Sequence, residues 1–139
     1  MVPTARQTAL DAVNFSHGFL VKIIDSFPPD ARTFQTGRAD NHVLWTLGHF
    51  CTTYEWITGM LKEGDPTLPS EYQTLFGMKS EPKPDAKLYP SYDELRRNFD
   101  QSYNAFIAAF QATSDADLAK PTVSDSGGFV PTRLAVMQV

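Results

Sequence analysis

The feature that most constrains the fold is the stretch after Gly37, where apolar residues recur at helical spacing on two neighbouring stripes. The first stripe advances by three or four residues at a time through Val43, Leu47, Phe50, Tyr54, Ile57 and Leu61. At about 100° per residue, a second stripe lies beside it and contains His42, Trp45, His49, Thr53, Trp56 and Met60. A helix that is apolar over more than half its circumference needs more than one neighbouring helix, so the sequence predicts a helical bundle.

This central helix follows a turn-like segment, Gly37-Arg38-Ala39-Asp40. We expect the helix to begin near Asn41. Asp40 or Asn41 is placed to cap the free N–H groups of its first turn, because short polar side chains accept hydrogen bonds there.

An earlier helix is predicted from about Thr4 to Ser26. Thr4 and Gln7 form a capping box, and the Phe27-Pro28-Pro29 sequence ends the helix. One face is apolar apart from a single histidine, and its members are Leu10, Val13, His17, Leu20, Val21 and Ile24.

The segment from Glu63 to Pro90 holds five prolines and excludes a long helix. Connections of this length are often functional or crossover segments. We expect Leu75 and Phe76 to attach it to the bundle.

A further long helix is predicted from the capping box of Ser91 and Glu94 to near Ala112. Its core stripe is Leu95, Phe99, Tyr103, Phe106, Ile107 and Phe110. One capped turn follows at residues 114–118, and a last helix start appears at Pro131-Thr132-Arg133. Residues 1–139 therefore read as a single all-α domain with three long helices and the first two turns of a fourth.

Composition excludes several classes of function. The net charge is −4, and the longest basic cluster is the pair Arg96-Arg97, so a nucleic-acid interface is not expected. Cys51 is the one cysteine, which rules out an internal disulfide and favours a reducing, cytoplasmic location. The first ten residues are polar and no window reaches about 18 apolar residues, so neither an export signal nor a membrane partner is expected.

The stretch Asn41-His42-Val43-Leu44-Trp45-Thr46-Leu47-Gly48-His49-Phe50 resembles the second-helix motif of the DinB-like (damage-inducible protein) bundles. In that motif an N-capping Asn precedes a Trp and, four residues later, a metal-binding His. The order of the later elements agrees with the family over essentially the whole chain. The resemblance implies an up-down four-helix bundle with a long connection between its second and third helices. By this comparison we expect the fourth helix to be incomplete in residues 1–139, with the C-terminal part of the family domain missing.

The family resemblance also implies a divalent metal held by one His of the second helix and two, spaced His-x3-His, of the fourth. Only His49 can be carried over to this chain. The function it implies is that of a divalent-metal-binding protein, a metal-dependent hydrolase or thiol transferase acting on a small-molecule or thiol substrate. The ion, zinc or nickel, is expected to bind weakly or not at all, because one imidazole does not make a three-ligand site.

For the other candidate residues we expect structural roles. His17 is expected to be a hydrogen-bonded core residue, although it faces inward and could approach His49. His42 is expected to cap the helix or face solvent. Trp45 and Trp56 are expected in the core. Cys51 points about 200° around the helix from His49, so the two form no catalytic dyad.

A second hypothesis stays open beside the metal protein. A non-catalytic helical module could have kept the bundle and lost the metal. An unfinished fourth helix would leave an apolar groove among the other three, and such grooves drive association, so a homodimer is expected.

Overall fold

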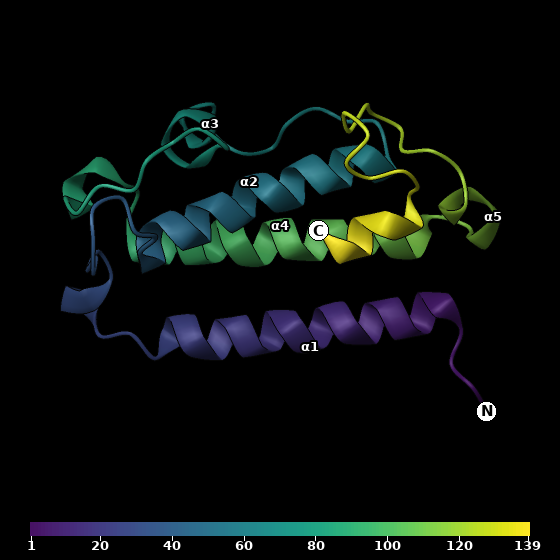
Figure 1. Ribbon diagram of the computed structural model, residues 1–139, viewed down its shortest axis with the longest axis horizontal. Coiled ribbons are helices and arrows are strands. Elements are labelled where there is room, and N and C mark those ends of the chain that lie inside the picture. The colour runs from purple at the N-terminus through teal and green to yellow at the C-terminus, as the bar shows by residue number, and fades with distance from the viewer.

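The computed structural model describes all of residues 1–139 and contains helices and loops but no strand. Its elements are α1 (Ala5–Asp25), η1 (Pro29–Ala31), α2 (Val43–Leu61), α3 (Glu71–Phe76), η2 (Ala86–Leu88), α4 (Tyr92–Ala112), α5 (Asp115–Leu118) and η3 (Leu134–Gln138). The three long helices lie roughly alongside one another, with α1 set apart from the α2 and α4 pair (Figure 1). The predicted all-α bundle class is confirmed.

Three helices begin at the side-chain caps that the sequence predicts. The hydroxyl of Thr4 accepts from the Gln7 N–H, that of Ser91 from the Glu94 N–H, and that of Ser114 from the Asp117 N–H. Each bond satisfies one of the free donors of a first helical turn. Local sequence therefore determines where α1, α4 and α5 start.

The cap of α2 predicted at Asp40 or Asn41 is wrong. Its N-cap is His42, whose Nδ1 accepts a hydrogen bond from the Trp45 N–H at 3.2 Å. The carboxylate of Asp40 instead accepts from the Thr36 hydroxyl, and Ala39 has a positive φ of 63°. Asp40 thus closes the preceding loop and is not free to cap the helix.

The core lies between α2 and α4. The ring of Tyr54 packs against the rings of Phe99, Tyr103 and Phe106 at centroid distances of 5.4 to 5.9 Å. The predicted α4 stripe is buried except for Ile107, which packs against the core at its edge. This aromatic contact is the main apolar interface of the molecule.

The long connection between α2 and α4 is a crossover. Cys51 of α2 contacts Leu95 near the start of α4, and Tyr54 contacts residues further along α4, so the two helices run in the same direction. Figure 1 shows the chain returning above α2 before it enters α4. The alternation of up and down is therefore broken between α2 and α4, because the connection is long enough to span the length of a helix.

The short helix α3 attaches this connection to the bundle. Phe76 is fully buried, as predicted, and so is Tyr72, whose hydroxyl accepts from the Asn98 side chain at 2.6 Å. Leu75 is only partly buried. A helix of six residues places Tyr72 and Phe76 on one face, because they are four residues apart.

Helix α1 runs antiparallel to α4, and several polar contacts join the two helices. The Arg6 guanidinium donates to the Asp115 carboxylate and to carbonyl groups at the C-terminal end of α4. Further along, the Tyr103 hydroxyl donates to the Asn14 side chain, and Arg96 pairs with Asp25 at 3.0 Å. The predicted apolar face does point toward the bundle, but only two of its residues are buried, Leu10 and Ile24.

The predicted last helix is present as the 3-10 turn η3. The Thr132 hydroxyl accepts from the Ala135 N–H at its start, and Val136 is buried against the core. Tight i→i+3 turns are common in segments as short as these five residues. None of the helices combines the length and the hydrophobicity that a membrane-spanning segment needs.

Candidate functional site

His49 lies on the side of α2 that faces the crossover connection. Its ring stacks on Trp45 at a centroid distance of 4.6 Å, and its Nδ1 lies 2.8 Å from the carbonyl oxygen of Phe76. Gly48 makes this approach possible, because a Cβ there would collide with the Phe76 ring. Gly48 thus brings the C-terminal end of α3 close enough for its carbonyl to meet His49.

The contact with Phe76 determines the tautomer of His49. A carbonyl oxygen can only accept, so Nδ1 carries the hydrogen and Nε2 of the neutral ring has a free lone pair. Nε2 has no hydrogen-bond partner. The Nε of Arg32 is the one buried side-chain nitrogen or oxygen without a partner, so Nε2 of His49 is reached by solvent.

This arrangement is typical of a histidine that binds a metal. Ligating histidines donate their other ring N–H to a carbonyl or carboxylate, which holds the ring orientation and makes the ligating nitrogen more basic. His49 has this second contact and an accessible nitrogen.

His42 is occupied on both sides of its ring. Nδ1 caps α2, and Nε2 donates to the Lys83 carbonyl at 2.7 Å. His42 is only 3% exposed, so the expectation that it faces solvent is wrong and the expectation that it caps the helix is confirmed. Burial lowers the pKa of His42, so the neutral ring that these two bonds require is favoured.

His17 belongs to a different cluster from His49. Its Nδ1 is hydrogen-bonded to the Tyr54 hydroxyl at 3.1 Å, and its ring stacks on Tyr103 at a centroid distance of 3.4 Å. Burial lowers the pKa of His17, while the charge of Asp100 acts in the opposite direction. The predicted hydrogen-bonded role is confirmed, and the structure does not bring His17 to His49 as a metal ligand.

A groove of about 400 Å³ runs between α1, α2, α4 and η3. Most of the residues that line it are apolar, among them Leu20, Phe50 and Ile57. Its polar lining residues are Ser16, His17, Thr53 and Gln138. Val136, Met137 and Gln138 of η3 also line the groove. Its place matches the apolar groove that the sequence predicts among the three long helices.

Two other sequence expectations have clear outcomes. Cys51 is fully buried, and burial raises the pKa of its thiol to about 12, so it is not a nucleophile at neutral pH. Trp45 lies in the core and donates from its indole N–H to the Ser80 hydroxyl. The core prediction for Trp56 is wrong, because this residue is 41% exposed.

The residues present do not complete a metal site. No group of three His, Cys, Asp or Glu side chains is close enough to hold one ion. A zinc site needs about three protein ligands, so His49 fits the role of one ligand and the others are not supplied by this arrangement.

Sequence reasoning missed two groups that shape this region. The Phe76 carbonyl orients His49, and main-chain atoms leave no signal in a sequence. Tyr54 and Tyr103 hold His17, and their helical spacing indicated only that they were apolar core residues.

The fold and this site define a helical-bundle protein whose α2 presents one histidine with a free, accessible ring nitrogen. Residues 17–139 match the model of the DinB superfamily, and the chain belongs to that superfamily. Comparison with curated proteins finds no match.

Proposed function

We propose that this DinB-superfamily protein binds a divalent transition metal, zinc or nickel, with Nε2 of His49 as one ligand. The observation that carries the proposal is the Nδ1–H bond to the Phe76 carbonyl, which leaves Nε2 free and exposed. The associated activity is of the metal-dependent hydrolase or thiol-transferase class, with a small-molecule or thiol substrate.

The remaining ligands have to come from residues outside this arrangement, on a further segment or a second chain. For residues 1–139 alone we therefore expect weak binding that depends on His49. A single imidazole leaves most of the coordination of the ion to water.

The test is zinc titration of the 139-residue protein, followed by the ring signals of its three histidines in NMR. The expected result is a shift of the His49 signals alone, with sub-stoichiometric metal by elemental analysis after dialysis. His49→Ala should abolish the effect, and His17→Gln is the matched control that should not. Shifts that persist in His49→Ala would contradict the proposal. Stoichiometric metal lost in that variant would support His49 but overturn the expectation of weak binding.

The non-catalytic module is the second candidate, and the incomplete donor set is the observation that favours it. In that case the bundle acts by self-association. It predicts no His49-dependent metal binding under any condition, together with a dimer that forms in the presence of a chelator.

A further inference from the structure

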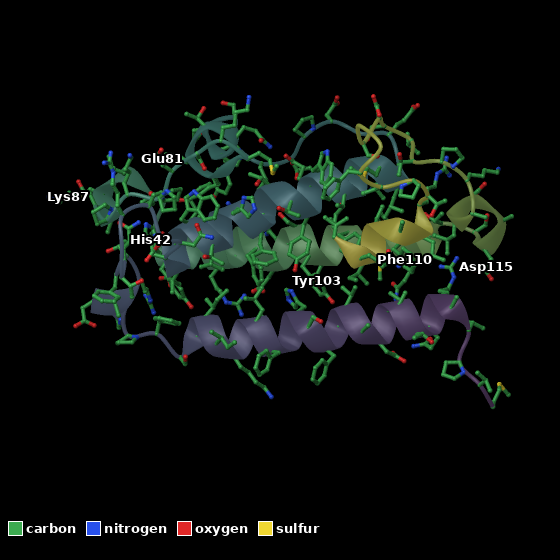
Figure 2. All side chains as sticks on the ribbon, in the orientation of Figure 1. His42, Glu81, Lys87, Tyr103, Phe110 and Asp115 are labelled. Atoms are coloured by element: carbon green, nitrogen blue, oxygen red, sulfur yellow. The ribbon has the colours of Figure 1, made fainter.

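The outward side of α1 carries large apolar residues that nothing covers. Phe15 is 77% exposed, Phe19 is 61% exposed and Ile23 is 43% exposed. They are spaced four residues apart and so share one stripe, opposite the face that holds His17 and Ile24. Figure 2 shows aromatic side chains projecting from α1 on the side away from the other helices. Single exposed apolar residues are ordinary, but a row of three is the kind of patch that marks an interface.

The charged residues beside this stripe are arranged so that two copies of the helix are complementary to each other. Two opposite charges flank the apolar residues along one edge, Asp11 toward the N-terminus and Lys22 toward the C-terminus. Each lies about 8 Å from a midpoint level with residues 16 and 17. Neither forms an ion pair within the chain, and Asp11 accepts only a hydrogen bond from Gln7.

A two-fold axis at that midpoint, perpendicular to the helix, would bring a second α1 alongside in the antiparallel direction. Asp11 of one copy then meets Lys22 of the other, and the same contact occurs twice. Phe15 meets Phe19 on the central line. Ile23 meets the small side chain of Ala12 on the other edge, so a large residue faces a small one. An isologous interface requires this kind of self-matching.

We propose that the outward face of α1 is a homodimer interface, formed by antiparallel pairing of two α1 helices through Phe15, Phe19 and Ile23. The inference does not depend on the metal site. It assigns the dimer to a surface different from the groove. One helix face per copy is small compared with the roughly 800 Å² per partner of a standard interface. The dimer is therefore concentration-dependent.

The test is sedimentation velocity of the 139-residue protein across a concentration series, with a chelator present so that metal plays no part. The expected result is a monomer–dimer equilibrium. Phe15→Ser with Phe19→Ser should raise the dissociation constant at least about tenfold, because two exposed rings lose their burial. The matched control is Phe129→Ser, at another phenylalanine that is 76% exposed, and it should leave the constant unchanged. Circular dichroism and thermal unfolding check that each variant folds.

Charge reversal tests the pairing itself. Asp11→Lys should weaken the dimer about fivefold, since it replaces two attractive contacts by repulsion. Lys22→Asp should do the same. The double variant, with both charges reversed, should recover the original constant because the introduced lysine of one copy would then face the introduced aspartate of the other. That recovery distinguishes the two-fold pairing from unspecific aggregation.

Three results would overturn the proposal. One is a monomer at every concentration. A second is a dimer that survives the loss of both phenylalanines, which would place association in the groove. The third is binding of the monomer to phosphatidylcholine vesicles through the same phenylalanines, which would make the stripe a lipid-contacting surface.

Discussion

Helices α1 and α2 are nearly equal in length, with 21 and 19 residues, and both carry strong apolar periodicity. Eleven residues of α2 are buried, against two in α1. The difference comes from their neighbours. Helix α2 has α4 on one side and α3 on another, whereas α1 has the groove between itself and most of the bundle. Periodicity thus predicts which face of a helix turns inward. How deeply that face is buried depends on which other elements pack against it.

The two helices also differ in the kind of contact that holds them. Packed aromatic rings hold α2 against α4. Helix α1 is held by hydrogen bonds or ion pairs of Arg6, Asn14, His17 and Asp25, and by the stacking of the His17 ring on Tyr103. Polar contacts at a partly exposed surface contribute little net free energy, so most of the folding stability should reside in α2, α3 and α4.

Removal of a core ring should have the largest effect. Phe99 is fully buried in α4, and Phe99→Ala should lower the free energy of unfolding by about 3–5 kcal/mol, because a large cavity forms. Leu20→Ala in α1 is the comparison, where the side chain is only partly buried and borders the groove. Urea unfolding of both variants measures the difference. Equal losses would contradict the division between the two regions.

A steric probe of the contact between α2 and α3 should rank second. Gly48→Ala places a Cβ against the Phe76 ring and should cost about 1–3 kcal/mol through overpacking. Gly59→Ala is the matched control in the same helix. Nothing lies within 4 Å of its new Cβ, so it should stabilise by up to about 1 kcal/mol. Thermal unfolding of the two variants measures both changes in stability. If Gly48→Ala also stabilised the protein, α3 would not be held tightly against α2.

Weakening the attachment of α1 should cost less. Arg6→Ala removes the bond to Asp115 and those to the last carbonyls of α4, where a cation also favours the helix dipole. We expect a loss of about 1 kcal/mol in global stability. Hydrogen exchange should accelerate in α1 with little change in α4. Uniform acceleration in both helices would show that α1 unfolds only with the core.

The smallest effect concerns pH. Burial lowers the pKa of folded His17 below 6.5, so the unfolded chain binds more protons in the range between the two values. Stability should therefore fall as the pH drops from 6.5 through the folded pKa. His17→Gln should flatten part of this slope, and His42, whose pKa is lowered in the same direction, should account for the rest. Urea unfolding at several pH values provides the measurement, and an unchanged slope in His17→Gln would show that protonation does not disturb α1.

The candidate site shows which of its features could be predicted from the sequence and which could not. His49 was predicted on the correct helix, and its role as a metal ligand stays a prediction. Trp45 and Trp56 occupy the same predicted stripe, yet one is buried and the other is exposed. Ser80 of the crossover reaches Trp45, and no comparable contact covers Trp56. Helical spacing is identical for the two, so no pattern within α2 could separate them.

The sequence by itself determined the helical segments, their inward faces and most of their caps, because those depend on interactions between residues three or four positions apart. The cap predicted for α2 at Asp40 or Asn41 was wrong because Asp40 bonds within its own loop, and His42 takes the capping role instead. Only the tertiary structure decided that α2 and α4 run parallel, that α1 stands apart, and that the Phe76 carbonyl orients His49. Those outcomes depend on the path of the long crossover and on the space that Gly48 leaves, which brings together groups distant in the chain.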